Sequence, residues 1–405
     1  MPDAPDLHLA ETLAAQVRRD PAAFPDAARL AAAAGVGAAE LDALFRRHFH
    51  ATPADFLARE RVAAARRHLA GGRAPAEAAS AVGWESLSAF DEDFRRLTGM
   101  APGDYRRLGA SPGFTLALPP DFRAADALRH FGRDTESPAE RAAGSDFVKA
   151  LRLAGTPARL HVRLEDGAAR CRVESARPVP PEGMRAAHAA VVRILGLGSD
   201  PAAFERHVVR EPVLGGLVAR RPGLRVPLTA DFFEALVWVI VGQQVNLPFA
   251  FALRREVFDL AGEDAGDGFR AHPTPEAVAA LDYADLTARR FSRRKAEYVI
   301  DTARLIATGG LDLDALADAP APAAEERLLA VRGLGPWSVQ YLLMRGLGFA
   351  DCVPLGDAGL TAALARAFAL GHRPGAAETA ALMEPFAPHR SLATFHLWTS
   401  LGDPA

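Results

Sequence analysis

Apolar side chains in the first quarter of the chain recur at the spacing of amphipathic helices. They stand at i, i+3, i+4 and i+8 early in this region, and at i, i+4 and i+7 near its end. The positions that carry the pattern are Leu41, Leu44, Phe45, Phe49, Phe90, Phe94 and Leu97. Glycines punctuate it at Gly35 and Gly83. The pattern predicts helices from Pro21 to about Leu108, after a tail or a short helix over residues 1–20.

The pattern changes to a period of two after a Pro- and Gly-rich joint that ends at Gly113. The strand-like stretches are residues 114–118, 160–164 and 169–173. The last two alternate apolar and polar side chains around Glu165-Asp166-Gly167, which is typical of a β-hairpin. A helix-like stretch lies near residues 121–132. These elements predict a small α+β unit over residues 112–178, and the prolines that follow end it.

From about Glu182 onward the pattern is helical again, with Gly- and Pro-rich loops between the helices. We expect helices over residues 182–195, 230–245, 248–261, 294–307, 324–331, 337–346, 357–369 and 389–400. The predicted fold class is therefore mainly α with a small α+β domain. The predicted domains are residues 1–110, 112–180 and 182–405.

Composition narrows the classes of protein that remain. No apolar run reaches the roughly 18 to 20 residues that a membrane span needs. The first six residues lack the basic head and apolar stretch of a signal peptide, so we expect a cytoplasmic protein. Cys171 and Cys352 have no partner at metal-ligand spacing, which argues against an iron–sulfur cluster, a zinc finger or a disulfide framework. Because the net charge is −3, any nucleic-acid surface must be local.

Two segments of the first helical region repeat the order helix, tight turn, helix. One covers residues 27–49 with Gly35 in its turn, and the other covers residues 75–98 with Gly83-Trp84 in its turn. With Phe94-Arg95-Arg96-Leu97-Thr98-Gly99-Met100-Ala101-Pro102, this region resembles the AraC-type DNA-binding domain over residues 27–107. It also resembles the regulatory part of the Ada alkylation-response protein. That protein's four-cysteine zinc domain and its methyl-accepting Pro-Cys-His-Arg are missing here, which excludes methyl transfer.

The helices that would read DNA carry unusual charges. The first contains Glu40 and Asp42, and the second contains Asp91-Glu92-Asp93. A helix-turn-helix reads bases through the start of its second helix. Carboxylates there face phosphates unfavourably, although they can accept a hydrogen bond from cytosine. Two interpretations remain: this module binds a specific DNA sequence, or it keeps the fold as a weakened reader or a docking piece.

A second motif lies in the last third of the chain. Leu328-Leu329-Ala330-Val331-Arg332 ends a predicted helix, Gly333-Leu334-Gly335 forms a hairpin, and Pro336-Trp337-Ser338 starts a new helix. Glycine permits positive φ and a close approach of the backbone to a ligand. Amides at the start of the new helix can bind a phosphate without reading sequence. A Gly-x-Gly turn by itself is weak evidence, because it also occurs as a plain connection between helices.

An acidic residue follows this hairpin. Val353-Pro354-Leu355-Gly356-Asp357-Ala358-Gly359-Leu360 places Asp357 22 residues after Gly335 and directly before an apolar helix. An isolated Asp at this point would be interpreted as a helix N-cap. The hairpin at this distance favours a functional carboxylate instead.

Together these features resemble the helix-hairpin-helix glycosylase superfamily, and within it the AlkA-type DNA-3-methyladenine glycosylase II. Further matching segments are residues 220–227, Val241-Gly242-Gln243-Gln244-Val245, Arg294-Lys295-Ala296-Glu297 and residues 390–398. The α+β unit at 112–178 is similar to that family's N-terminal domain, so the resemblance covers about residues 112–400.

The resemblance implies a DNA N-glycosylase, which flips a damaged nucleotide out of the duplex and excises its base. It makes Asp357 the catalytic carboxylate, which stabilises positive charge on the sugar and orients or deprotonates a water. It assigns DNA binding to the backbone of Gly333 and Gly335 and to the Gln243-Gln244 turn, with Gln244 as the wedge that fills the gap.

Three aromatic residues, Trp337, Tyr341 and Trp398, match the family's base pocket. Electron-rich faces favour a cationic base by about 1–2 kcal/mol when desolvated. Each of the three could instead be an ordinary core residue, which is how we interpret Trp238.

The lysines bear on the type of reaction, because lyase activity needs a Schiff-base amine. In bifunctional members of the superfamily, a lysine stands two residues after the second hairpin glycine, where this chain has Trp337. The sequence contains only Lys149, in the α+β unit, and Lys295, which with Arg294 belongs to a basic run. We interpret that run as a phosphate-contacting or merely solvated face and predict hydrolysis without β-elimination.

The resemblance also sets the expected partners. They are double-stranded DNA with alkylated bases, bound by a monomer that contacts no membrane. No metal or organic cofactor is expected, and a monovalent cation at the hairpin is the one ion that the resemblance allows. The alternatives are an alkylation-responsive transcription regulator with a vestigial glycosylase domain, a relative that excises a neutral lesion such as 8-oxoguanine or a mispaired thymine, and a bridging protein whose helix-turn-helix module contacts other proteins.

Overall fold

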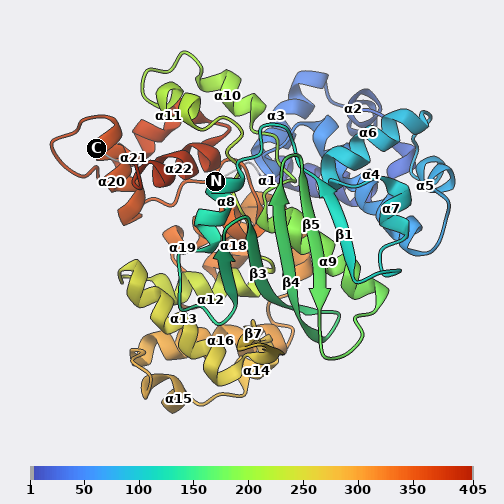
Figure 1. The fold of residues 1–405 in the computed structure, drawn as a ribbon. Helices are drawn as coiled ribbons and strands as arrows, with labels where there is room; N and C mark the ends of the chain where they lie inside the picture. The colour runs from blue at the N-terminus through green and yellow to red at the C-terminus, as the bar shows by residue number, and fades with distance from the viewer. Residues whose placement is uncertain (1–3, 404–405) are drawn as a thin grey trace.

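The computed structural model describes residues 4–403, so the predicted outer domain limits at residues 1 and 405 lie outside the described residues. Figure 1 shows a central antiparallel sheet, a group of helices from the start of the chain on one side of it, and a larger helical body from the second half of the chain. Within residues 4–403, no helix is both long enough and apolar enough to span a membrane.

The first helical group confirms the helices predicted from Pro21 to Leu108. Its elements are α1 (Ala4–Arg19), η1 (Pro21–Ala23), α2 (Ala27–Ala34), α3 (Ala38–Phe49), α4 (Pro53–Ala70), α5 (Pro75–Ala81), α6 (Leu87–Thr98) and α7 (Pro102–Arg106). Gly35 ends α2 with φ +69°, and Gly83 lies between α5 and α6 with φ +85°. A Cβ on Gly83 would lie 2.9 Å from the Cα of Ala22, so this turn has room only for glycine.

The sheet has five antiparallel strands in the order β1-β5-β4-β3-β2. The elements of this unit are β1 (Gly113–Ala117), α8 (Ala124–Phe131), β2 (Glu140–Ala143), β3 (Asp146–Leu153), β4 (Thr156–Glu165) and β5 (Ala168–Glu174). The predicted hairpin is confirmed, because Glu165 pairs with Ala168 across its turn. The sequence pattern missed β2 and β3. Strand β3 does not alternate cleanly, since it buries three consecutive residues that include the charged Lys149.

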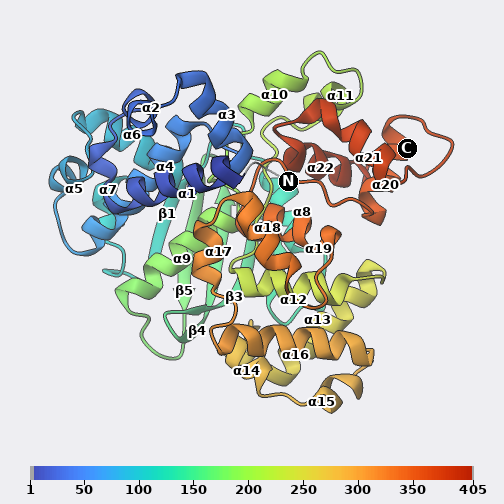
Figure 2. The ribbon, with the colours of Figure 1, turned by 180° about the vertical axis from the view of Figure 1, so that it is seen from behind.

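One hydrophobic core joins the second helix-turn-helix to the sheet. It contains Phe90 and Phe94 of α6, Leu116 of β1, and Met184 and Val191 of α9 (Pro181–Ile194), the helix that covers the sheet in Figure 2. The ring of His188 on α9 is hydrogen-bonded through Nε2 to the carbonyl of Thr98, at 2.9 Å. The predicted boundaries near residues 110 and 180 therefore mark changes of pattern along the chain, not separate cores.

The second half of the chain forms the larger helical body. Its elements are α10 (Ala202–Val208), α11 (Leu214–Arg220), α12 (Phe232–Gly242), α13 (Leu247–Ala261), β6 (Glu263–Gly266), β7 (Phe269–Ala271), α14 (Pro275–Ala279), α15 (Tyr283–Thr287), α16 (Arg293–Ala307), α17 (Leu313–Asp318), α18 (Ala321–Leu329), α19 (Pro336–Tyr341), the π-helical turn η2 (Leu342–Leu347), α20 (Ala358–Ala367), α21 (Ala376–Met383), η3 (Glu384–Phe386) and α22 (Arg390–Ser400). Each helix predicted from periodicity is present within a few residues. The helix expected at 337–346 is α19 continued by η2, and the short elements between the long helices were not predicted.

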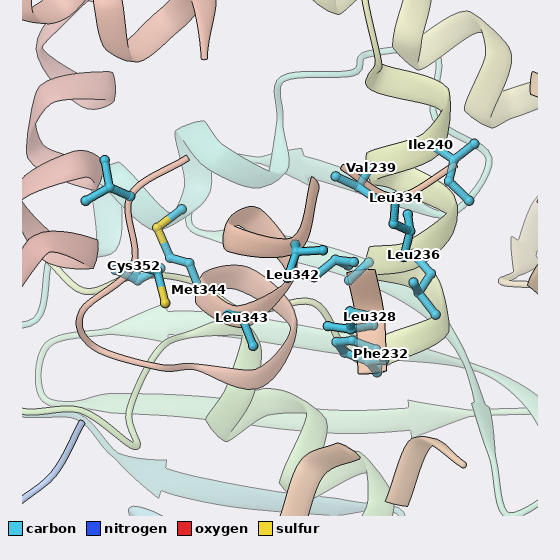
Figure 3. Close-up of a cluster of buried hydrophobic side chains, with 14 of the residues drawn as sticks. Phe232, Leu236, Val239, Ile240, Leu328, Leu334, Leu342, Leu343, Met344 and Cys352 are labelled. Carbon is cyan, nitrogen blue, oxygen red and sulfur yellow. The ribbon is translucent and has the colours of Figure 1, made fainter. Parts of the chain in front are cut away.

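Helix α12 runs through the middle of this body. All but its Trp238 and Gly242 are buried, and Figure 3 draws Phe232, Leu236, Val239 and Ile240 in one buried cluster with side chains of the hairpin region. That region contributes Leu328, Leu334, Leu342, Leu343 and Met344 to the cluster. The burial of these side chains fixes the hairpin relative to the end of α12.

The shared core leads to a stability prediction. Phe94→Ala removes a fully buried ring from the core that contains β1, so we expect a loss of about 3–5 kcal/mol and weaker hydrogen-exchange protection of the β1 and β5 amides. The matched control is Phe45→Ala, which removes an equally buried ring from the separate cluster of α1, α2 and α3. Protection in β1 that responds equally to both changes, or to neither, would contradict a core shared with the second helix-turn-helix.

Candidate active site

The hairpin between α18 and α19 takes its shape from its two glycines. Gly333 has φ +96°, and a Cβ there would lie 2.4 Å from the Tyr298 ring, so a side chain cannot be accommodated without moving the ring. Gly335 is the N-cap of α19, and its Cβ direction is open space. Leu334 between them is buried in the core. The result is a rigid turn whose exposed face is backbone, as an anion-binding helix start requires.

Asp357 lies at the N-terminus of α20 and acts as its N-cap. Its Oδ1 accepts a hydrogen bond of 2.7 Å from the Leu360 amide. It also accepts from two indoles: Trp398 Nε1 donates to Oδ1 at 2.9 Å and Trp337 Nε1 donates to Oδ2 at 3.1 Å. The side chain is half-buried and forms no ion pair within residues 4–403. Its negative charge is therefore held in place by neutral donors and is not cancelled by a neighbouring cation.

The aromatic residues named from the sequence form one wall beside this carboxylate. Trp337 and Tyr341 lie one turn apart on α19, and their ring centroids are 6.0 Å apart. Trp398 comes from α22, and its centroid is also 6.0 Å from that of Tyr341. All three are half-buried, so they have faces that a ligand can reach.

A fourth aromatic residue belongs to this wall although the sequence pattern did not indicate it. We predicted Trp238 to be a core residue. It packs at the edge of the core, but its Nε1 donates to the Tyr341 hydroxyl at 2.9 Å and its ring lies 5.2 Å from that of Phe251. Because α12 is apolar on both sides of Trp238 and Glu234 is its one charged residue, nothing in its pattern distinguishes Trp238 from its buried neighbours.

The Gln243-Gln244 turn follows α12 and lies against the hairpin. The Gln243 amide nitrogen donates to the Gly333 carbonyl at 2.8 Å and to the Ser338 hydroxyl at 3.1 Å. Gln243 is thus a brace between the turn and the hairpin, and its amide donors are not turned outward. Gln244 is exposed and has φ +54°, a left-handed conformation that non-glycine residues rarely adopt.

The prediction for Lys295 as an outward-facing DNA contact is wrong. Its ammonium donates to the carbonyls of Ile240, Val241 and Gln243, at 3.2, 2.7 and 2.7 Å. The Ile240 carbonyl also accepts from the Gln243 amide at 3.3 Å, so the ammonium adds to the capping of the end of α12, which a cation stabilises. Burial lowers the pKa of Lys295 to about 8. Arg294, by contrast, is exposed and has no hydrogen-bond or ion-pair partner among residues 4–403, so it can reach an external anion.

Three of the five acidic residues named on the two recognition helices are paired on their own helices. Asp42 binds Arg46 on α3 at 2.6 Å. On α6, Asp91 binds Arg95 at 2.6 Å and Asp93 binds Arg96 at 2.8 Å. These carboxylates are therefore partly compensated, and sequence-specific DNA binding by this module stays a prediction.

Metal-ligating side chains do not gather near the site. Within residues 4–403, no group of three or more His, Cys, Asp or Glu side chains is placed to hold a metal ion. Cys171 and Cys352 are both buried and free, and burial raises the pKa of Cys171 to about 12. Neither thiol lines the aromatic wall.

The hairpin, the carboxylate beyond it and the aromatic wall define the class of helix-hairpin-helix DNA repair proteins. Residues 237–388 match the family model described as HhH-GPD superfamily base excision DNA repair protein. Residues 113–231 match the AlkA N-terminal domain, and residues 30–108 match a helix-turn-helix domain. The match to the AlkA N-terminal domain extends past α9, which agrees with the core that this helix shares with the sheet.

Proteins similar in sequence identify the family within this superfamily. The DNA-3-methyladenine glycosylase of Bacillus subtilis is 34% identical over 208 residues, which are 51% of this chain and 69% of that protein. A Mycobacterium tuberculosis protein named "Probable bifunctional transcriptional activator/DNA repair enzyme AlkA" is 32% identical over 216 residues, which are 52% of this chain and 42% of that protein. The chain belongs to the DNA-3-methyladenine glycosylase family.

The alignments do not span these relatives completely. Across the bacterial relatives with glycosylase or AlkA names, they cover between 42% and 69% of the relative's length. Among solved structures, 3-methyladenine DNA-glycosylase from Archaeoglobus fulgidus superposes with a TM-score of 0.63 at 21% identity, over 71% of this chain and 97% of that one. That likeness shows the fold.

The bonds of Lys295 lead to a prediction about the end of α12. Lys295→Met keeps most of the side-chain volume but removes the ammonium that donates to three carbonyls, of which only that of Ile240 keeps a backbone donor, so we expect a loss of about 1–3 kcal/mol in the free energy of unfolding, measured by urea denaturation. The matched control is the neighbouring Arg294→Met, which removes an exposed charge and should stay within about 0.5 kcal/mol of the parent. Equal stability of the two variants would show that Lys295 does not hold the turn.

Proposed function

We propose that the protein is a DNA glycosylase that hydrolyses the N-glycosidic bond of alkylated, cationic purines in double-stranded DNA. The observation that carries this proposal is the Asp357 carboxylate, uncancelled by any cation and oriented by two indole N–H groups, at the edge of an aromatic wall. Family membership supports the reaction class, and we propose that a monomer without a cofactor carries it out.

The substrate and the Asp357 carboxylate each contribute to the rate of the proposed reaction. Alkylation at N3 or N7 gives the purine a positive charge, so the base leaves readily and needs no strong acid. Positive charge then develops on the sugar as an oxocarbenium ion. A fixed carboxylate beside that sugar lowers the energy of the charged state, because it is already oriented when the charge appears. The same carboxylate can orient or deprotonate the attacking water.

Base flipping calls for a side chain that enters the duplex. Gln244 suits this role because it is exposed at a turn whose backbone is held on both sides. Lys295 fixes the carbonyl of Gln243, and the Gln243 amide fixes the turn to Gly333. The hairpin amides next to this turn would grip the phosphate backbone without reading sequence.

The reaction should stop at hydrolysis. A lyase needs a lysine amine that can reach the sugar. Trp337 occupies the position at which the family's lyases carry that lysine, and it holds Asp357 instead. Lys149 is buried between two glutamates, and Lys295 donates to three carbonyls. Neither amine lies free at the aromatic wall.

Asp357→Asn tests the role of the carboxylate. Asparagine caps a helix about as well as aspartate, but its amide nitrogen cannot accept from Trp337, so we expect a loss of only about 1–2 kcal/mol in the free energy of unfolding. Removal of the fixed negative charge should lower kcat for base release from a methylated duplex by at least about a hundredfold. Asp312→Asn, at the exposed N-cap of α17, is the matched control and should retain full activity. Equal release by parent and Asp357→Asn, or no release by the parent, would reject the proposed function.

Lyase chemistry can be tested separately on the product. We expect that a duplex incubated with the enzyme contains intact abasic sites that break only after alkaline treatment. Borohydride added during the reaction should trap no protein–DNA adduct, because no amine forms a Schiff base. A trapped adduct that disappears in Lys295→Met would show that this lysine leaves its carbonyls and reaches the sugar.

A further inference from the structure

A small cavity of about 60 Å³ lies behind the aromatic wall, between α8 of the sheet unit and the helical body. Tyr341 and Trp238 line it, so the side chain that forms the middle of the wall is also a side of this cavity. The other lining side chains used below are His130, Arg133, Thr229, Glu234 and Arg345. A base stacked against Tyr341 would therefore turn one edge toward these polar groups.

Two guanidinium groups meet on one imidazole at the cavity. Arg345, on the turn η2, donates from Nη2 to His130 Nε2 at 3.0 Å. Arg133 donates to the same nitrogen at 3.2 Å and from Nε to the His130 carbonyl at 3.0 Å. Because His130 Nε2 accepts both bonds, the ring is neutral. Burial and the two guanidinium groups hold its pKa well below the usual range.

Several donors at the cavity have no acceptor among residues 4–403. Arg345 is 5% exposed, and its buried Nε has no partner. The hydroxyl of Thr229 is likewise buried and unpaired. The Tyr341 oxygen accepts from Trp238, but its own proton has no acceptor in this part of the structure. Buried polar groups are almost always paired in folded proteins, so these donors indicate a place for an acceptor atom of a ligand.

The carboxylates at the cavity do not offset the two guanidinium charges. Glu140 and Glu234 form a closed ring of ion pairs with Lys149 and Arg254, with distances of 2.8 to 2.9 Å. Two negative charges balance two positive ones within that ring. Glu234 Oε2 remains without a partner. The ring of ion pairs is neutral as a whole, so it does not balance the positive charges of Arg133 and Arg345. The cavity is thus positively charged and rich in donors.

We propose that Arg345 and Arg133 make the base pocket select purines that carry a carbonyl oxygen at C6 over purines that carry an amino group there. The inference rests on the proposed function. N7-methylguanine keeps O6 as an acceptor at C6, because its methyl group blocks only N7, whereas N3-methyladenine carries an N6 amino donor at C6. An acceptor facing the two guanidinium groups satisfies them. An amino group would leave their donors unpaired and place its own hydrogens against positive charge.

The test uses one substrate that carries both kinds of base. A duplex of random sequence treated with a methylating agent contains N7-methylguanine and N3-methyladenine, and chromatography separates the two released bases. Arg345→Met removes a guanidinium at nearly constant volume. We expect it to lower the rate of release of N7-methylguanine relative to N3-methyladenine by about tenfold to a hundredfold. The two lesions lose their bases at different intrinsic rates, but these rates are the same for every variant. A change in the ratio between variants therefore reports only the protein's contribution.

Two further variants keep the test decisive. Arg345 is buried, so its replacement can disturb the fold. Arg133 is exposed, and Arg133→Met should shift the ratio in the same direction by a smaller factor. Arg129→Met is the matched control, because Arg129 lies on α8 four residues before Arg133, is 64% exposed and binds Asp126 away from the cavity. It should leave the ratio unchanged.

The outcomes separate this inference from the proposed function. An unchanged ratio in both Arg345→Met and Arg133→Met, or an equal loss of both bases, would overturn the selection by C6. If Arg345→Met does not fold, the ratio in Arg133→Met decides alone. Failure of the parent protein to release either base would reject the proposed function itself, whatever the variants do.

Discussion

The carboxylate of Asp357 is the point at which three helices of this protein meet. It caps α20, receives the indole N–H of Trp337 from α19 and receives that of Trp398 from α22. A helix cap and a functional carboxylate are therefore not alternatives at this position. The cap fixes the carboxylate relative to the backbone, and the two indoles fix its plane relative to the aromatic wall. A charge held in this way needs no reorganisation when a positive charge appears beside it.

The loop that leads to this carboxylate is also one of the places where the N-terminal helices contact the helical body. His50, at the end of α3, accepts a hydrogen bond of 3.0 Å from the Asp351 amide. Asp351 in turn accepts from Arg390 at 2.6 and 2.7 Å, and Arg390 begins the helix that carries Trp398. Burial lowers the pKa of His50 to about 4, so its ring stays a neutral acceptor. The helix-turn-helix module is thus built into the same framework as the candidate site.

Strong periodicity made the long helices predictable, and the spacing from Gly335 to Asp357 made the centre of the site predictable. What the sequence could not reveal depends on contacts between distant segments. Lys295 looks like part of a basic face, but the end of α12 lies within its reach and takes all its donors. Trp238 looks like core because its helix is apolar, yet it meets Tyr341 at the wall. Strand β3 lost its alternation because Lys149 is buried against glutamates from other elements.

The charges around the wall are arranged along the direction of the proposed reaction. Cleavage of the glycosidic bond moves an electron pair from the sugar to the base, so the sugar becomes positive while the alkylated base becomes neutral. In the proposed reaction Asp357 faces the sugar, and Arg345 and Arg133 lie at the cavity behind Tyr341. The negative group stabilises the charge that forms. If a base binds there as we propose, the guanidinium groups would oppose its positive charge before cleavage and cease to oppose it once that charge is gone. Both effects favour the transition state over the bound substrate, which is the condition for a faster chemical step.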